Sequence, residues 1–146
     1  MFKSLMTKKL NKKGFTLAEL LVVVAILAIL IAVSVPIFAS RIEGARKSTD
    51  LANIRAAKAA AVTDYLSAET TGTVDGFYDA DKGIIVDDSR DIKPYGQSKA
   101  SITDDGTTSH NAPEGKVLEV KVDVNGNVTM EWVAPAAGAP AAGATR

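Results

Sequence analysis

The chain has 146 residues, which is enough for one small domain and too few for two independent hydrophobic cores. It contains no cysteine, which excludes the disulfide framework that stabilises many small exported domains. The formal net charge is zero, but five lysines and no acid lie in residues 1–14, so the remainder holds 12 basic against 17 acidic residues. This acidic body, with a balance of −5, argues against nucleic-acid binding as the main task.

The first segment, residues 1–14, is predicted to be a cytoplasmic leader peptide. Its lysines are Lys3, Lys8, Lys9, Lys12 and Lys13. Lysine-rich segments next to an apolar span are retained on the cytoplasmic side of a membrane. We therefore expect a single-pass protein of the cytoplasmic membrane with its N-terminus in the cytoplasm.

Residues 15–39 are predicted to form a transmembrane helix. The 22 residues from Leu17 to Phe38 are almost wholly apolar and would span about 33 Å as a helix, close to the roughly 30 Å of a bilayer core. A secretory signal peptide would have a shorter apolar core and a small-residue cleavage site, which Ile37-Phe38-Ala39 matches poorly. A plain signal anchor explains the length of the segment. Neither alternative explains a carboxylate at Glu19, since ionisable groups inside a span are costly and usually functional.

Residues 40–69 are predicted to continue this helix in amphipathic form. At 100° per residue, Lys58 lies in the middle of one apolar side, where its stem could pack and its ammonium reach solvent. The apolar residues of that side are Ile54, Ala61, Val62, Tyr65 and Leu66. We expect this side to pack against the rest of the domain.

Residues 70–133 are predicted to form a globular head that ends in a β-hairpin. Apolar residues alternate with polar ones from Leu118 to Val122 and again from Val128 to Trp132, which indicates two strands with one buried face. A two-residue turn at Asn125-Gly126 would mix the faces, whereas a three-residue loop with Gly126 in the left-handed conformation keeps them consistent. That loop pairs Val122 with Val128, Val120 with Met130 and Leu118 with Trp132. The segment Lys82–Val86 is a further candidate strand.

The last segment, residues 134–146, is rich in alanine, proline and glycine and is predicted to be disordered. The predicted fold class is therefore α+β. A long N-terminal helix, half membrane-spanning and half amphipathic, packs on a small antiparallel sheet.

The sequence from Lys12 to Leu30, KKGFTLAELLVVVAILAIL, resembles the prepilin-type cleavage and methylation motif of type IV pilins and pseudopilins. The resemblance makes Gly14 the last residue before the prepilin peptidase cut and Phe15 the N-methylated first residue of the mature chain. It makes Glu19 the acidic residue that sets assembly and register, and Pro36 the site of a helix kink.

The resemblance implies a pilin-like fold and a function in assembly, not catalysis. The expected product is the structural subunit of a type IV pilus-like filament, extracellular or envelope-spanning, from a bacterium. The expected partners are the prepilin peptidase, other copies of the chain and related pilins, a membrane assembly platform, and the lipid bilayer before assembly. No direct nucleic-acid binding and no cofactor are expected.

Two alternatives stay open from the sequence. The first is a pseudopilin of a type II secretion or competence (DNA-uptake) system, which shares the same motif. The second is a membrane-tethered extracellular binding domain, in which the head is a receptor and the helix a spacer.

No catalytic site is predicted, because no serine or threonine lies in a nucleophile-elbow or triad-like pattern. His110, with no cysteine or second histidine near it, is predicted to be a surface loop residue. The weak candidates for a metal site are Asp79, Asp81, Asp87 and Asp88, since carboxylate oxygens bind hard cations. A solvated acidic loop is the favoured interpretation of this run.

Overall fold

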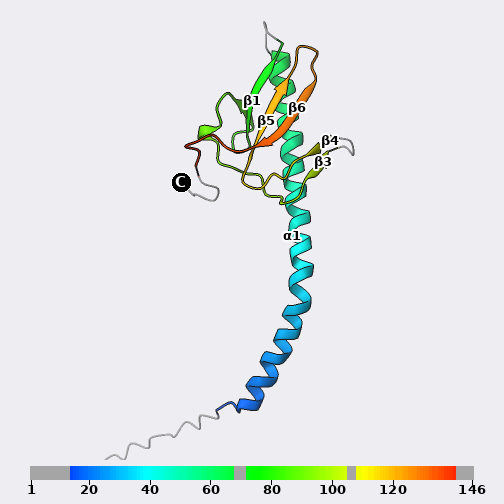
Figure 1. The fold of residues 1–146 in the computed structure, drawn as a ribbon, viewed down its shortest axis with the longest axis vertical. Coiled ribbons are helices and arrows are strands. Elements are labelled where there is room, and N and C mark those ends of the chain that lie inside the picture. Colours follow the sequence, from blue (N-terminus) through cyan, green and yellow to red (C-terminus); the bar gives the residue numbers. More distant parts are fainter. Residues whose placement is uncertain (1–13, 68–71, 105–107, 141–146) are drawn as a thin grey trace, which may run out of the picture. The chain divides into compact units, whose positions relative to one another are not determined.

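The computed structural model describes residues 14–67, 72–104 and 108–140 and shows an α+β chain (Figure 1). Its elements are the helix α1 (Leu17–Ser67), the strands β1 (Val74–Asp79) and β2 (Ile84–Val86), the 3-10 turn η1 (Ser89–Asp91), and the strands β3 (Ile102–Asp104), β4 (Thr108–His110), β5 (Val117–Val122) and β6 (Val128–Val133). The predicted fold class, one long N-terminal helix on an antiparallel sheet, is confirmed.

The chain divides into two compact units, Met1–Ala39 and Ser40–Arg146, and α1 contributes residues to both. In the first unit α1 is long and apolar enough to cross a membrane, and none of the residues of its most apolar stretch is buried. The helix is continuous at Pro36, where the missing N–H removes one backbone hydrogen bond. Two residues before this proline, the Ser34 hydroxyl donates to the Leu30 carbonyl at 2.7 Å. The predicted kink at Pro36 stays a prediction.

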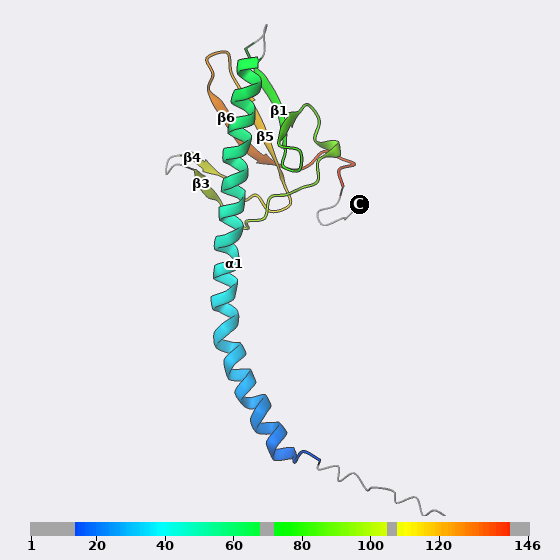
Figure 2. The same ribbon diagram turned by 180° about the vertical axis from the view of Figure 1, so that it is seen from behind.

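In the second unit, α1 ends at Ser67, and residues 68 and 69 of the predicted amphipathic segment lie outside the described part of the chain. Four antiparallel strands form a sheet in the order β2-β1-β5-β6, and β3 and β4 form a separate antiparallel pair. Figures 1 and 2, seen from opposite sides, show that the four-stranded sheet covers one side of this part of α1.

The register predicted for the C-terminal hairpin is confirmed. Strands β5 and β6 pair Val122 with Val128, Val120 with Met130 and Leu118 with Trp132. Gly126 has a φ of 81°, and its N–H donates to the Asp123 carbonyl at 2.9 Å. The three-residue loop needs glycine at this position, because a residue with a side chain would be strained at this left-handed φ.

The sequence analysis missed β1, although this strand lies in the interior of the sheet. Its sequence, VDGFYD, places two aspartates and a glycine among three apolar residues without strict alternation. The glycine has a tertiary reason: a Cβ at Gly76 would lie 2.7 Å from the Val86 carbonyl oxygen and 2.8 Å from Cγ2 of Ile85. Gly76 therefore permits the close approach of β2, which was expected at Lys82–Val86 and is formed by Ile84–Val86.

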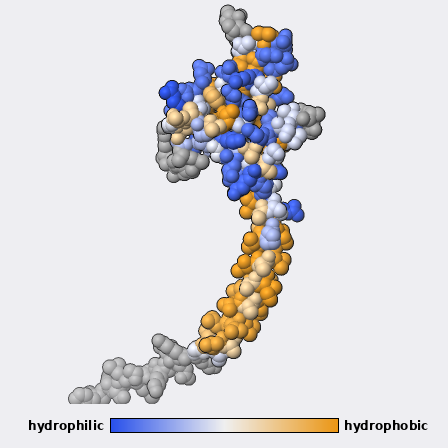
Figure 3. All heavy atoms as spheres, viewed as in Figure 1, coloured by the Kyte–Doolittle hydropathy of each residue, from blue (hydrophilic) through white to orange (hydrophobic). Residues whose placement is uncertain are grey.

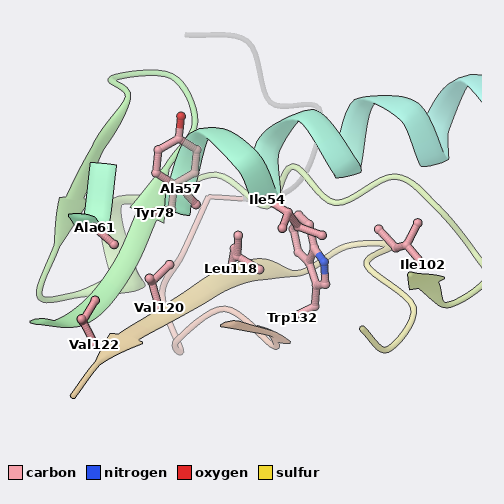
Figure 4. Packing of buried hydrophobic residues seen from close by; sticks show 9 residues of the cluster. All are labelled: Ile54, Ala57, Ala61, Tyr78, Ile102, Leu118, Val120, Val122 and Trp132. Carbon is pink, nitrogen blue, oxygen red and sulfur yellow. The ribbon is translucent and has the colours of Figure 1, made fainter. Parts of the chain in front are cut away.

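The core lies between α1 and the sheet, as Figure 4 shows for nine of its residues. The helix contributes Ile54, Ala57 and Ala61, while the four-stranded sheet contributes larger side chains. Those sheet residues are Tyr78, Leu118, Val120, Val122 and Trp132. The small alanines allow the helix to approach the sheet closely.

The apolar side predicted for this helix was only partly correct. Ile54 and Ala61 are buried and Tyr65 packs against the core, but Val62 is 39% exposed and Leu66 is 77% exposed. The reason is that the buried row is narrower and rotated from the predicted one. It follows Asp50, Ile54, Ala57 and Ala61, at helical spacings of four, three and four residues.

The loop between η1 and β3 is held to the sheet by Tyr95. Its hydroxyl donates to the Tyr78 carbonyl at 2.8 Å and accepts the Leu118 N–H at 3.2 Å. Its ring makes edge contacts with Tyr78 and Trp132. Burial raises the pKa of the Tyr95 hydroxyl, which stays neutral and keeps both hydrogen bonds.

His110 was predicted to be a surface residue and is instead 96% buried, with 4% of its surface exposed. Its Nδ1 lies 3.2 Å from the Met130 carbonyl oxygen, and the Asn111 side-chain amide donates to the Trp132 carbonyl at 3.1 Å. These two side chains bind carbonyl groups of β6, a strand at the edge of its sheet. They protect that edge from pairing with another strand.

The predicted disorder of the tail stays a prediction. Within residues 134–140, the Ala136 N–H donates to the Ser89 hydroxyl at 3.1 Å and the Ala139 N–H donates to the Ala136 carbonyl at 3.1 Å. The sequence composition gave no sign of the Ser89 contact, which is formed with a residue far away in the chain. Residues 141–146 lie outside the described part of the chain.

Candidate functional site

The candidate site is the junction at which α1 begins. Gly14, Phe15 and Thr16 are exposed and not helical, and α1 starts at Leu17. Phe15 is 90% exposed. A peptidase needs an accessible, non-helical backbone, and the Gly14–Phe15 bond meets both requirements. The remainder of the predicted leader, residues 1–13, lies outside the described residues.

The fold itself does not require a glycine at position 14. A Cβ built on Gly14 meets no described atom within 4 Å, and the backbone there is not left-handed. A larger side chain would therefore fit without strain in the described part of the chain. A requirement for glycine at position 14 would therefore come from a partner that binds the junction, because a protease pocket can exclude any side chain.

Glu19 and Thr16 form a capping box at the start of α1. The Thr16 N–H and hydroxyl both donate to Oε2 of Glu19, at 2.8 and 2.7 Å, and the Glu19 N–H donates to the Thr16 hydroxyl at 3.2 Å. This reciprocal pair satisfies backbone donors that the first turn of a helix leaves unpaired. The sequence analysis missed Thr16, although the pattern Thr-x-x-Glu before an apolar run is the signature of this motif.

The capping box fixes the Glu19 carboxylate beside the residue that follows Phe15. Within the described residues, Oε2 of Glu19 accepts hydrogen bonds and Oε1 of Glu19 accepts none, so Oε1 can still accept one from a partner. A negative charge is favoured here, because the N-terminus of a helix carries partial positive charge. Glu19 thus lies in the first turn of α1, directly after the exposed Gly14 and Phe15, while Pro36 lies further along the same helix.

Beyond the junction, α1 presents a continuous apolar surface. Its exposed large hydrophobic residues run from Leu17 to Ile37 and Phe38, and Phe15 precedes them in the junction. Figure 3 shows the hydrophobic colour over the visible face of this segment, whereas the visible face of the second unit is mostly hydrophilic. A surface of this length and kind requires lipid or other apolar helices around it.

Two of the four candidate metal ligands, Asp79 and Asp88, accept hydrogen bonds from neighbouring residues. Asp79 accepts hydrogen bonds from the Lys82 ammonium at 2.8 Å and from the Asp81 N–H at 3.0 Å, and Asp88 accepts from the Arg90 backbone and side chain. Burial raises the pKa of Asp79, but its hydrogen bonds outweigh burial and hold this pKa below its ordinary value. Within residues 14–67, 72–104 and 108–140, no three His, Asp or Glu side chains gather as a metal site would require.

Two carboxylates of α1 hold the loop at residues 97–100, a feature that the sequence analysis missed. Asp50 accepts the Ser98 N–H at 2.6 Å and the Gln97 N–H at 3.1 Å. Glu43, two turns earlier, accepts the Ser98 hydroxyl and the Lys99 N–H, both at 2.8 Å. Burial raises the pKa of the Asp50 carboxyl, whereas the hydrogen bond from Ser98 holds the pKa of Glu43 below its ordinary value. This arrangement fixes the head to its helix.

Residues 9–35 match the family model described as the prokaryotic N-terminal methylation motif. This motif is the prepilin-type signal of type IV pilins and pseudopilins, which are structural subunits and not enzymes. No curated protein and no solved structure is significantly similar to the chain. The match covers the junction and most of the apolar segment, so it supports a pilin-like or pseudopilin protein.

Proposed function

We propose that the chain is the structural subunit of a type IV pilus-like surface filament. In this proposal the prepilin peptidase cuts after Gly14, Phe15 becomes the N-methylated first residue, and the apolar part of α1 packs with other copies in the filament core. The methylation motif over residues 9–35 and the exposed Gly14–Phe15 bond support the processing step.

The observation that carries the proposal is a fully exposed apolar helix segment with one carboxylate at its start. Lipid satisfies the apolar residues before assembly, and neighbouring helices satisfy them afterwards. The bilayer does not satisfy the charge of Glu19, since an ionised side chain within a span is costly. A partner that places a cation beside Glu19 at this depth would offset the cost of burying its charge.

The cation is the new amino group of Phe15. Cleavage after Gly14 creates it, it carries positive charge near neutral pH, and N-methylation keeps that charge. Because Oε2 of Glu19 is held by Thr16, Oε1 is the oxygen available to the amino group of a neighbouring copy. Such a pair would set the axial register of each entering subunit, a use of buried charges that is known in other assemblies.

The proposal also assigns partners and a location. Before cleavage, the lysines of the leader keep the N-terminus in the cytoplasm while α1 spans the cytoplasmic membrane. Removal of these five charges allows an assembly platform to lift the apolar segment out of the bilayer. The head then lies on the outside of an extracellular or envelope-spanning filament.

Variants at the capping box separate the two roles of Glu19. Glu19→Gln keeps an oxygen that can accept from Thr16 but removes the charge, and Thr16→Ala removes the cap but keeps the charge. We expect cells that make Glu19→Gln or Glu19→Val to process the chain and insert it in the membrane, and electron microscopy to show few or no filaments. Thr16→Ala should still assemble.

The opposite pattern, with normal filaments from Glu19→Gln and none from Thr16→Ala, would show that Glu19 acts only as a cap. Short envelope-spanning fibres from the native chain would identify it as a pseudopilin. A processed native chain that never forms a fibre would refute the proposal and favour a tethered binding domain.

A further inference from the structure

One exposed face of α1 in the second unit carries a basic stripe. We define it as Lys47, Leu51, Arg55, Lys58 and Val62, which follow one another at spacings of four, four, three and four residues. Residues at these spacings share one side of a helix. The stripe lies beside the buried row that begins at Asp50, and its last three members are exposed.

The cations of the stripe are poorly compensated within the chain. Arg55 forms a long ion pair, with its Nε 3.8 Å from Oδ1 of Asp104, whereas Lys47 and Lys58 form no ion pair with any described residue. Two acids of the same helix, Glu43 and Asp50, bind the loop at residues 97–100 instead of the stripe. Arg55, Lys58, Ala59, Val62 and Asp104 line a shallow open groove.

A second patch, the acidic edge, lies at β2 and η1. It consists of Asp81, Asp87 and Asp91, which are exposed and form no ion pair within the described chain. Two cations near this edge form their closest ion pairs with other acids, Lys82 with Asp79 and Arg90 with Asp88. Asp91 still interacts electrostatically with both. Strand β2 is an edge strand, and its Ile84 is 48% exposed between these acids.

We propose that the basic stripe of one copy binds the acidic edge of another copy. Each patch combines a charge that forms no ion pair within the described residues, Lys58 on the stripe and Asp87 on the edge, with an exposed apolar residue, Val62 on the stripe and Ile84 on the edge. Charge and hydrophobic contact therefore match together. No ion pair joins the two patches within the described residues of one chain. The basic stripe of one molecule can therefore attract the acidic edge of a neighbouring molecule.

A contact between two different patches has a geometric consequence. It is heterologous, so a bound pair still has a free edge on one copy and a free stripe on the other, and the contact repeats as an open helical filament or a closed ring. This inference rests on the proposed function. It names the contact between α1 of one copy and the β2 edge of the next that would accompany packing of the apolar helices. Exposed charge pairs contribute little energy individually, so the contact mainly sets which faces meet.

Cysteine cross-linking tests the contact directly, because the native chain has no cysteine. A full-length chain with both Lys58→Cys and Asp87→Cys is expressed in the native host, and its filaments are oxidised. We expect a ladder of disulfide-linked multimers. Either single variant alone should stay monomeric. The matched control pairs Lys58→Cys with Glu131→Cys, an exposed acid on β6 outside the acidic edge, and should give no ladder.

Charge exchange gives an independent result. Lys58→Glu with Arg55→Glu should reduce the amount of filament, and adding Asp81→Lys with Asp87→Lys in the same chain should restore it. Filaments that form normally but give no ladder, or a control pair that cross-links equally, would overturn the interface while leaving the proposed function intact. Normal filaments from the stripe variant, with lost binding to anionic phospholipid vesicles, would assign the stripe to a lipid surface instead. Failure of the native chain to form any fibre would refute both.

Discussion

Thr16 and Glu19 define the start of α1, and their hydrogen bonds leave the carboxylate with one oxygen engaged. A cap is useful in any helix, but most helices do not place their capping glutamate at the head of an apolar segment that no part of the chain covers. At the residue scale, the junction therefore combines a local structural role with a charge that needs a partner.

The first prediction concerns Gly14. A Cβ at position 14 meets no described atom within 4 Å, so we expect Gly14→Val to insert and fold normally. The peptidase should nevertheless fail to cut, because valine adds a branched side chain at the bond to be broken. The leader would then stay attached, and an immunoblot would show a chain that is longer than the native mature form. Normal cleavage of this variant would contradict the assignment of the site.

The second prediction concerns Asp50. Asp50→Ala leaves the buried Ser98 N–H without its acceptor, and an unsatisfied buried donor costs about 1–3 kcal/mol. We expect the free energy of unfolding to fall by this amount and Asp50→Asn to lose less, because it keeps one acceptor oxygen. Fluorescence of Trp132, the single tryptophan, which is 1% exposed, reports the unfolding of the head in detergent.

Asp64→Ala is the matched control for Asp50, since Asp64 is an exposed acid on the same helix and binds no described residue. Its free energy of unfolding should be close to that of the native chain. If Asp50→Ala is as stable as this control, the loop at residues 97–100 is not held by the carboxylate.

At the scale of the elements, glycine is favourable in the β5–β6 hairpin at Gly126 and unfavourable inside α1 at Gly44. Gly126→Ala forces a residue with a side chain into a φ of 81°, which costs about 1–2 kcal/mol. Gly44→Ala lies inside α1 with no described atom within 4 Å of the new Cβ, so it should add up to about 1 kcal/mol through helix propensity. Urea unfolding followed by Trp132 fluorescence should show shifts of opposite sign. Shifts of the same sign would contradict this account.

Some elements could be predicted because their signal is local in the sequence. The pairing of Val122 with Val128 follows from strict alternation and the position of Gly126. The long apolar helix follows from its composition, and the capping box of Thr16 was readable from the motif although it was missed. In each case the residues that determine the structure lie within one turn or one hairpin of each other.

Other features depend on contacts between residues far apart in the chain. Gly76 is required by the approach of β2, and without that contact Val74–Asp79 lacks the alternation of a strand. Asp50 looks like an exposed helix residue until its partners at Gln97 and Ser98 are known. His110 is buried because it binds the edge of β6. No pattern in one segment reveals these arrangements.

At the scale of the whole molecule, two kinds of surface have no partner within the described chain. The apolar surface of α1 from Phe15 to Phe38 requires lipid or other helices, and the basic stripe and acidic edge of the second unit offer complementary charges. In the proposed filament, bundled helices cover the apolar surface of α1. Contacts between neighbouring copies pair the basic stripe with the acidic edge. Both depend on the same initial event, because the leader must be removed before the helix can leave the membrane.

The most direct test of the account is the mass of the mature chain, isolated from the envelope or from filaments of the native host. We predict that mass spectrometry will find a chain that begins at Phe15 and carries one added methyl group on its amino nitrogen. A chain that retains the lysine-rich leader, or one that begins near residue 40, would contradict the central claim.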